Sequence, residues 1–314
     1  MPFVTVAICT WNRAAMLDRV LAHLRTLRIP AGVDWEVLVV NNNSTDETDA
    51  TIARHAGKLP IRRAFEPQPG ISLARNRALR ESRGDIVAWT DDDAFPEPEW
   101  IEKTLEAFER FDAELVFGRV DPDWESAQPS WFTPKFRGMF ALIDLGGEPR
   151  LVTESHIVGF NVNMAFRKSL VARIGEYRSD IGSGRMAGGE DIDLFQRAHR
   201  HGVRIAYQPE AVVRHHIPAS RCTKSFYRSY TWGGSPNHLK LLMDEGRRVP
   251  KLFGLPRYFL RRQLSYVPEY FRAVLRADAG EAFYCELKLI RLAGLYWSIF
   301  TRRDPRKVHH RAGE

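Results

Sequence analysis

The sequence is poor in cysteine and lacks a long apolar run. Its three cysteines, Cys9, Cys222 and Cys285, are far apart and odd in number, which argues against a disulfide framework and fits a reducing compartment. The longest charge-free apolar stretch near the end, Leu292–Phe300, is far short of the roughly 20 residues that span a bilayer. The first residues, MPFVTVAICT, resemble a strand more than a signal peptide. We therefore expect a cytoplasmic protein, either in solution or peripheral on the membrane.

Two common nucleotide-binding motifs are also missing. The chain has no G-x-x-x-x-G-K-[ST], which excludes the P-loop class, and no G-x-G-x-x-G that follows a strand. Gly182-x-Gly184 lies instead in a glycine-rich stretch, Ser179–Gly189, which is typical of a mobile linker or a lid. No internal repeat is present.

The positive charge is confined to the C-terminal third. Residues 221–314 hold 19 Lys and Arg against 8 Asp and Glu, a net +11, so residues 1–220 carry −4 of the chain's +7. A basic, aromatic-rich tail favours an anionic partner such as a lipid headgroup or a polyphosphate carrier, with a solvated basic face as the alternative. It lacks a base-reading motif, so we expect no nucleic acid. Apolar and basic residues alternate in one segment, where peripheral membrane contact is expected: Leu252, Phe253, Arg257, Tyr258, Phe259, Leu260, Arg261 and Arg262.

Strand and helix patterns alternate along the first two thirds of the chain. This alternation predicts an α/β fold with a mainly parallel central sheet flanked by helices. Helices are expected over Pro98–Phe111 and from Glu190. We predict a catalytic domain over residues 1–220 and a helical, basic extension over residues 221–314, with two or three helices broken at Pro250, Pro256 and Pro268. The expected strands are Phe3–Cys9, Trp35–Val40, Ile61–Phe65, Ile86–Trp89, Glu114–Val120, His156–Arg167 and Ala211–Val213.

Polar clusters follow four of these strands. They are Thr10–Arg13, Asn41–Asp46, Asp91–Asp93 and His215–His216. Because the carboxyl ends of parallel strands lie on one edge of a sheet, these clusters are expected to converge. Three adjacent carboxylates repel one another unless a cation or their own protonation relieves them, and oxygen ligands suit Mg²⁺ or Mn²⁺. A solvated acidic turn is the structural alternative. With amide and guanidinium donors beside the metal, the edge has the groups that a nucleoside diphosphate requires.

Two further groups admit a functional and a structural interpretation. Glu190 and Asp191 open a predicted helix, where carboxylates stabilise the positive helix terminus. Alternatively, one of them is a general base beside the metal. His215 is a candidate metal ligand, but it can equally be a histidine satisfied by neighbouring groups.

The combined motifs resemble the family 2 glycosyltransferases, which have the GT-A (Rossmann-like) fold, use nucleotide sugars and invert the anomeric centre. The match runs in order from Val4 to about His216, and the ordered set is far more specific than any one part. The matching segments are VAICTWNR (6–13), VLVVNNNSTDET (37–48), PGISLARNRAL (69–79), IVAWTDDDA (86–94), GFNVNMAFRKSLVARIGEY (159–177) and GGEDIDLFQRAHRHG (188–202).

The resemblance implies a role for each matched position. Asp91 and Asp93 match the outer acids of the family's DxD motif, with Asp93 as the direct metal ligand and Asp92 facing the ribose. Asp191 matches the catalytic base of the ED motif, and Glu190 its first acid. The remaining positions are expected to contact the nucleotide sugar: Thr10, Asn12, Arg13, Asn41, Asn43, Arg75, Gly159, Asn161 and Asn163.

One position departs from the family pattern. Asn41 stands where many relatives carry an aspartate that reads uracil. The implied donor is therefore a nucleotide-diphosphate sugar, UDP-sugar first and GDP-sugar as the alternative, and the implied acceptor is a saccharide or a lipid-linked saccharide. A sugar nucleotidyltransferase, a nucleotide-sugar hydrolase and a non-catalytic sugar- or nucleotide-binding module remain alternatives.

Overall fold

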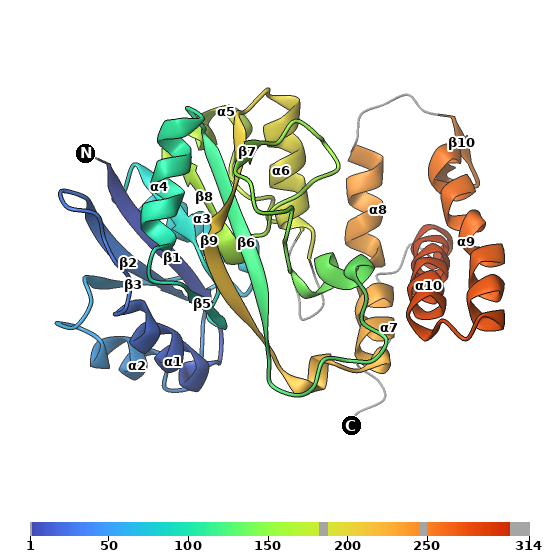
Figure 1. The fold of residues 1–314 in the computed structure, drawn as a ribbon, viewed down its shortest axis with the longest axis horizontal. Helices are drawn as coiled ribbons and strands as arrows, with labels where there is room; N and C mark the ends of the chain where they lie inside the picture. The colour runs from blue at the N-terminus through green and yellow to red at the C-terminus, as the bar shows by residue number, and fades with distance from the viewer. Residues whose placement is uncertain (1, 182–187, 245–249, 302–314) are drawn as a thin grey trace. The chain divides into compact units, whose positions relative to one another are not determined.

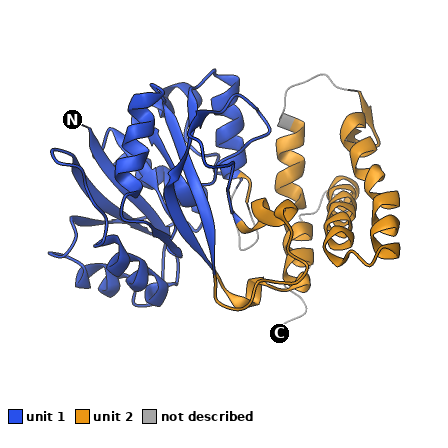
Figure 2. Cartoon of the chain, viewed as in Figure 1, with its two compact units in different colours: residues 1–123, 141–184, 190–216 blue, residues 124–140, 185–189, 217–314 orange. Residues whose placement is uncertain are grey.

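A computed structural model gives the fold and describes residues 2–181, 188–244 and 250–301. The described residues form two compact units (Figure 2). Unit 1 comprises those of 1–123, 141–184 and 190–216, and unit 2 those of 124–140, 185–189 and 217–314. Segment 124–140, which the sequence analysis placed in the catalytic domain, thus clusters with the C-terminal helices.

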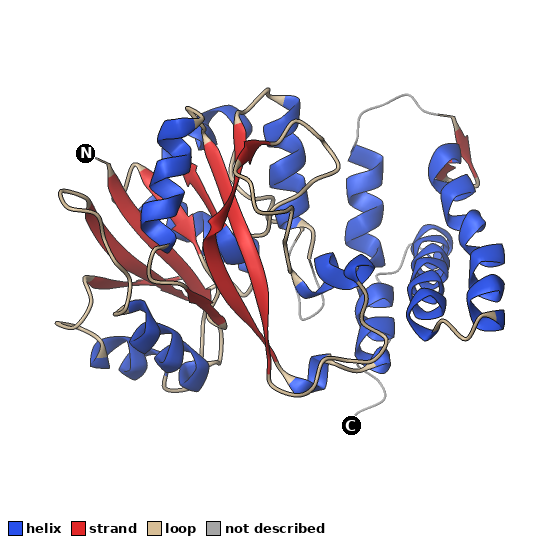
Figure 3. Cartoon of the chain, viewed as in Figure 1, coloured by secondary structure: helices blue, strands red, loops and turns tan. Residues whose placement is uncertain are grey.

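A nine-stranded sheet, drawn in red in Figure 3, forms the centre of unit 1. Its strand order is β3-β2-β1-β4-β8-β6-β9-β5, and β7 pairs with β9. The four strands from β3 to β4 are parallel, whereas β8 runs antiparallel to both β4 and β6. The sheet strands are β1 Phe3–Thr10, β2 Asp34–Asn41, β3 Ile61–Phe65, β4 Ile86–Trp89, β5 Ala94–Pro96, β6 Leu115–Trp124, β7 Arg150–Leu151, β8 Met164–Arg167 and β9 Ile205–Ile217.

Strands β6 and β9 run in the same direction. The backbone N–H of Glu114 bonds to Arg204 at their starts, and that of Glu125 bonds to Ile217 at their ends. Six strands therefore share one direction, and β5, β7 and β8 oppose it, which confirms the mainly parallel sheet. The buried apolar runs of β1, β2 and β4 explain this arrangement, since strands covered on both faces lose the polar alternation of a solvated sheet.

Helices cover the sheet of unit 1 (Figure 1). Helix α3 packs along β1, β2 and β3, and α2 contacts β2 and β3. The predicted helix over Pro98–Phe111 is α4, and the one expected from Glu190 is α6. The helices of this unit are α1 Ala14–Leu24, α2 Thr48–Arg54, α3 Ile71–Glu81, α4 Trp100–Arg110, α5 Val171–Ile174 and α6 Glu190–Arg200.

Two strand predictions were inaccurate. The strand expected over His156–Arg167 is confined to β8, because Asn161–Asn163 form a 3-10 turn before it. The strand expected over Ala211–Val213 is the centre of the longer β9. Most of the glycine-rich stretch Ser179–Gly189 lies outside the described residues, and its role as a linker or lid stays a prediction.

Unit 2 is mainly helical, with an antiparallel pair of short strands, β10 Lys251–Leu252 and β11 Leu255–Pro256. The prediction of two or three helices was too low, because the described part of this unit holds four. Pro268 lies inside helix α9. Because proline has no N–H, the carbonyl of Leu264 lacks its usual helical donor. Both residues are exposed, so water can satisfy that carbonyl. The helices are α7 Lys224–Gly233, α8 Ser235–Asp244, α9 Arg257–Leu275 and α10 Ala279–Thr301.

Candidate active site at the carboxyl edge of the sheet

The ends of β1 and β2 are joined by side chains from their own turns. Thr10 pairs with Asn41 in the strand register, and both turns that follow contain an asparagine with positive φ, Asn12 at 51° and Asn43 at 60°. Asparagine tolerates this left-handed conformation better than most residues. The Asn12 Oδ1 atom accepts a hydrogen bond from the Thr45 N–H at 2.7 Å. The two strand ends therefore form one rigid polar surface.

The Asn41 side chain is already fully engaged at this surface. Its Nδ2 donates to Asp49 Oδ1 at 2.6 Å, and its Oδ1 accepts from the Ser44 N–H at 2.8 Å. Asp49 in turn binds Arg63 through both of its carboxylate oxygens. An aspartate at position 41 would place a second carboxylate against Asp49. The departure from the family pattern thus has a local electrostatic reason.

The three consecutive acids after β4 have unequal surroundings. Asp92 is buried and accepts hydrogen bonds from Thr10 Oγ1 at 2.7 Å and Arg13 Nη1 at 2.8 Å. Asp93 is also buried, between Arg13 Nη1 at 2.7 Å and His215 Nε2 at 3.4 Å. Asp91 keeps 36% of its side chain exposed and lies 3.8 Å from Arg75 Nη2. Only Asp91, among these three, presents its carboxylate to solvent.

These surroundings shift the carboxyl pKa values in different directions. Burial raises the pKa of Asp92 to about 6 against the opposing charge of Arg13. The protein around the partly exposed Asp91 carboxyl removes part of its hydration, and this desolvation, followed by the charge of Asp93, raises the pKa of Asp91, although Arg75 opposes the shift. For Asp93, burial is outweighed by His215 and Arg13, which hold its pKa well below the ordinary value. Asp93 is therefore the acid that stays ionised most firmly, as expected of a direct metal ligand.

Asp93 and His215 offer adjacent donor atoms for a cation. Strand pairing sets this neighbourhood, because Ala94 on β5 lies opposite His215 on β9. Two neighbouring ligands of an octahedral ion with bonds of about 2.1 Å lie about 3 Å apart, which is close to the 3.4 Å between Asp93 Oδ1 and His215 Nε2. With Asp91 facing solvent beside them, the donor set suits a divalent cation whose other ligands come from water or phosphate.

A second group of charges surrounds Arg75, which α3 holds in a buried position. Its Nη1 atom binds Glu190 Oε1 at 2.5 Å and Asp191 Oδ1 at 3.0 Å. Its guanidinium carbon also lies 5.6 Å from the centre of the Tyr177 ring. Both carboxylates project from the first turn of α6. The structure thus brings the DxD-like and ED-like acids to one guanidinium, which spacing alone could not predict.

Asp191 is held from two sides. Besides Arg75, it accepts a short hydrogen bond from Asn161 Nδ2 and a longer one from the Asn161 N–H at 3.5 Å. The Tyr177 hydroxyl donates to Asn161 Oδ1 at 2.6 Å, which fixes the orientation of the amide. Burial, partly offset by Arg75, raises the pKa of Asp191 to about 7. A half-buried carboxylate with a pKa near neutrality can both accept and release a proton at physiological pH.

Asn163 and Gly159, two of the predicted sugar-binding residues, lie against buried groups of the sheet and its helices. The Asn163 amide bonds to Trp100 Nε1, the Arg119 carbonyl and the Ala211 carbonyl, each at 2.8 Å. A Cβ atom on Gly159 would lie 2.7 Å from the Phe195 ring. Both positions therefore support the Asn161 segment from behind, and their contact with a sugar remains a prediction.

Two residues that the sequence analysis did not assign also belong to this edge. Tyr177 was quoted only as the end of a motif, although its hydroxyl orients Asn161. Trp11 follows Thr10 directly and is 46% exposed, unusual for the largest side chain. Trp11 could have been assigned to the site from the sequence, because it is an aromatic residue in a polar turn after the first strand.

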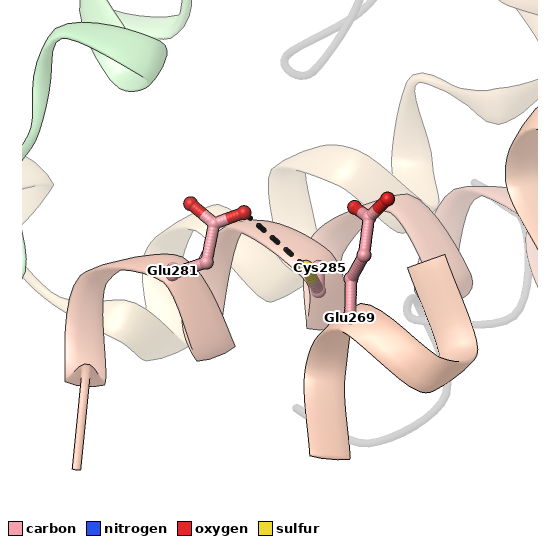
Figure 4. Close-up of side chains that lie close together, drawn as sticks. All are labelled: Glu269, Glu281 and Cys285. Atoms are coloured by element: carbon pink, nitrogen blue, oxygen red, sulfur yellow. Dashed lines mark hydrogen bonds between the residues drawn. The ribbon is translucent and has the colours of Figure 1, made fainter. Parts of the chain in front are cut away.

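A third group of ligand-type atoms lies in unit 2, away from these residues in the sequence. Figure 4 shows Glu269, Glu281 and Cys285, whose ligand atoms lie within 4.8 Å of one another. Glu281 is paired with Lys135 Nζ at 2.5 Å. Burial, and then the charge of Glu281, raises the pKa of Cys285 to about 11. A thiol that keeps its proton is a poor metal ligand, so we interpret this group as packing between α9 and α10.

Comparison with known proteins agrees with this geometry. Residues 5–175 match the model of the family described as "Glycosyl transferase family 2". The succinoglycan biosynthesis protein ExoM of Rhizobium meliloti is 25% identical over 254 residues, which cover 80% of this chain and 79% of that protein. The glucosyl-dolichyl phosphate glucuronosyltransferase of Haloferax volcanii is 26% identical over 261 residues, which cover 77% and 79%.

Solved structures show the same fold. The mannosyltransferase PcManGT from Pyrobaculum calidifontis, in complex with GDP-Man and Mn²⁺, matches with a TM-score of 0.63 and 18% identity, over 96% of this chain and 88% of that one. S. aureus TarS 1-349 in complex with UDP-GlcNAc matches with a TM-score of 0.55 and 14% identity, over 96% and 93%.

Proposed function

The chain belongs to glycosyl transferase family 2 and is a glycosyltransferase, and we propose that it moves a sugar from a nucleotide-diphosphate sugar to an acceptor hydroxyl with inversion at the anomeric carbon. The observation that carries the proposal is the meeting of Asp91 and Asp191 at Arg75. This arrangement puts acids suited to a metal–diphosphate complex beside an acid suited to proton transfer. The alternatives of a nucleotidyltransferase or a binding module have no comparable support.

In the proposed reaction, Asp191 takes the proton from the acceptor hydroxyl as that oxygen attacks the anomeric carbon. The carbon–oxygen bond to the nucleoside diphosphate breaks on the opposite side, so one displacement inverts the centre. Asn161 holds the Asp191 carboxylate in place, and Arg75 offsets the negative charge of Glu190 and Asp191. Because the Asp191 pKa is about 7, a substantial share of the enzyme carries the base form at neutral pH.

We propose that Asp91, Asp93 and His215 hold Mg²⁺ or Mn²⁺. The adjacent donor atoms of Asp93 and His215 support this assignment, and a relative in the fold is described with Mn²⁺. When bound, such an ion neutralises charge on a departing diphosphate. Arg13, which binds both Asp92 and Asp93, keeps these acids in place and supplies a positive charge of its own at the same edge.

The nucleoside is proposed to bind over the turns after β1 and β2. The exposed ring of Trp11 offers a stacking face for a base. Asn12, Asn41 and Asn43 are proposed to surround the nucleoside. UDP is the first candidate and GDP the second, and the Asn41 amide already donates a hydrogen bond to Asp49. Relatives of the fold are described with each nucleotide.

We further propose a saccharide acceptor, lipid-linked at the membrane surface, as the names of the two relatives suggest. In the segment expected to contact the membrane, Leu252, Phe253 and Tyr258 are exposed, and α9 presents a further apolar face. Phe259 and Leu260 are buried, and Phe259 packs with Leu255 and Leu295. The exposed apolar stripe lies farther along α9, at Leu264, Val267, Phe271, Val274 and Leu275.

Charge next to this stripe favours an anionic bilayer. Helix α9 has five arginines including its C-cap Arg276, against one acid, Glu269, the composition of a helix that lies in an anionic membrane interface. None of the helices in the described part of the chain is both long and apolar enough to cross a bilayer. We expect Phe271→Ser with Leu275→Ser to reduce sedimentation with vesicles containing phosphatidylglycerol. Unchanged sedimentation of the folded variant would exclude this face.

The reaction itself is tested with donor binding and turnover measured separately. A thermal-shift screen of UDP and GDP with Mn²⁺ identifies the nucleotide, and release of nucleoside diphosphate from matching sugar donors measures turnover. We expect Asp191→Asn to keep donor binding but to lower turnover by roughly 10²–10⁴-fold, the usual contribution of a general base. The surface variant Glu106→Gln is the matched control and should retain both. Full turnover in Asp191→Asn would refute the assigned base.

A further inference from the structure

Three basic side chains lie on two neighbouring helices of unit 2, with Lys288 and Arg291 half-buried and Arg262 exposed. Lys288 and Arg291 are three residues apart on α10 and so share one face of that helix, and Arg262 projects from α9. The two helices pack along each other (Figure 1). Lys288 Nζ lies 4.5 Å from the centre of the Tyr284 ring. The Tyr284 ring in turn packs against the ring of Tyr266 on α9. Lys288 is therefore held against an aromatic ring rather than by an acid.

No carboxylate balances these cations within the part of the chain that the structure describes. The acids on the same helix are used elsewhere, since Glu281 pairs with Lys135 and Glu286 with Arg228. Unit 1 shows the opposite pattern, in which Arg13 and Arg75 each bind two carboxylates.

The effect of this imbalance appears in the acid–base properties of the cluster. Burial, and then the charges of Arg291 and Arg262, lower the pKa of Lys288 to about 7. Burial also lowers the pKa of Arg291, which faces only Tyr230 and Tyr284 besides the other cations. Unpaired cations in a desolvated position destabilise a fold. An anion seated among them would relieve their mutual repulsion and replace lost hydration.

An additional polar atom points to the same conclusion. His238, on α8, is close enough to Lys288 and Arg291 that these charges, after burial itself, lower its pKa to about 3. Its Nε2 atom is buried and has no hydrogen-bond partner among the described residues. The ring packs against Phe259 at 5.6 Å between centres. A buried ring nitrogen without a partner is costly unless a ligand or water completes it.

We propose that Arg262, Lys288, Arg291 and His238 form a binding site for a phosphate or diphosphate group. Guanidinium and ammonium donors make their strongest hydrogen bonds with such oxygens. The anion can come from two sources, a free inorganic phosphate compound or the diphosphate of a lipid-linked acceptor. The second source rests on the proposed function, whereas the site itself does not.

The test uses inorganic pyrophosphate and the whole protein, without donor and with EDTA, so that a metal-dependent site does not contribute. We expect pyrophosphate to raise the melting temperature of the wild type. Lys288→Met and Arg291→Met should each weaken this binding at least tenfold. Without anion at pH 6.5, each should melt at a higher temperature than the wild type, because a repelled cation is gone. Arg276→Met, an exposed arginine at the end of α9, is the control and should change neither property.

Binding can also be followed without any substitution. Lys288 faces Arg262, Arg291, His238, Tyr284 and Cys285, and a bound anion should raise its pKa. Because free Lys288 is mostly neutral at pH 8, pyrophosphate binding there should take up a proton, which calorimetry in two buffers of different ionisation enthalpy measures. Lower melting temperatures in both methionine variants, or pyrophosphate binding without proton uptake, would overturn the proposal.

Farnesyl diphosphate in detergent distinguishes the two sources. A lipid-linked ligand predicts that farnesyl diphosphate binds at least tenfold more tightly than pyrophosphate and that Lys288→Met weakens both. Equal affinity for the two probes would assign the site to a free anion. Pyrophosphate binding that survives in Lys288→Met and Arg291→Met would contradict the site whatever the outcome of a glycosyl-transfer assay, so the two proposals fail independently.

Discussion

Replacing Tyr177 with phenylalanine should change the pKa of Asp191 through Asn161, while Asp191 itself is left in place. The Tyr177 hydroxyl donates to Asn161 Oδ1 at 2.6 Å, and the same amide donates through Nδ2 to Asp191. Without the hydroxyl, Asn161 Oδ1 is left buried and unpaired, and the amide loses the contact that fixes its orientation. We therefore expect Asp191 to lose part or all of a charge-assisted hydrogen bond.

The size of the effect follows from the hydrogen bonds involved. A hydrogen bond to a charged group contributes about 1.5–3 kcal/mol, and one pKa unit corresponds to about 1.4 kcal/mol. Loss of the Asn161 bond to ionised Asp191 should thus raise the pKa by about 1–2 units, from its present value of about 7. The unpaired Asn161 oxygen should also lower the free energy of unfolding by about 1–3 kcal/mol.

The assay is the pH dependence of kcat/KM for donor turnover. Because the proposed reaction needs the base form of Asp191, activity should rise with pH through the Asp191 pKa and reach a plateau above it. In Tyr177→Phe the midpoint of this pH profile should move upward by about 1–2 pH units, with similar activity on the alkaline plateau. Tyr207→Phe, which removes a buried hydroxyl contact to Leu145 far along the chain, is the matched control. A destabilised Tyr177→Phe variant with an unchanged midpoint would refute the relay through Asn161.

The other predictions concern the charges and packing around the same edge. Asp93→Ala should abolish metal-dependent donor binding in calorimetry, whereas Asp92→Ala should weaken it less; equal, minor effects would contradict the unequal roles of these acids. Arg75→Met leaves acidic neighbours uncompensated and should cost about 3–5 kcal/mol of unfolding free energy in urea, with an Asp191 pKa above 7 in the pH profile. Gly159→Ala should cost about 1–3 kcal/mol, because its Cβ would overlap an aromatic ring; a neutral result would show that the ring can move.

The sequence was sufficient to predict the parallel half of the sheet and the location of its polar edge. Short buried runs such as Ile86–Trp89 and Ile61–Phe65 coincide with β4 and β3, because β-branched and aromatic residues bounded by turn formers leave few alternatives. Parallel strands then require that Thr10, Asn41 and Asp91–Asp93 share one edge. This part of the site is a consequence of strand periodicity and chain direction.

The contacts within the site could not be predicted in the same way. Nothing in the spacing of Arg75, on a helix after β3, indicates that it binds Glu190 more than a hundred residues later. The structural use of Asn163 was hidden for the same reason, since an asparagine in a sugar-lining motif can equally complete the hydrogen bonds of a strand and a tryptophan. Tertiary packing decides both, and a residue type alone does not.

The charge balance of the edge links the two parts of the site. Five carboxylates, Asp91, Asp92, Asp93, Glu190 and Asp191, meet the guanidiniums of Arg13 and Arg75 and the ring of His215. Even with the ring protonated, these groups leave net negative charge, and neighbouring carboxylates add to the effect of burial in raising the pKa values of Asp91, Asp92 and Asp191. A diphosphate would add to that charge. A divalent cation at the proposed metal site would let the donor and the acids share this edge, so metal and donor should bind cooperatively, each raising the affinity for the other.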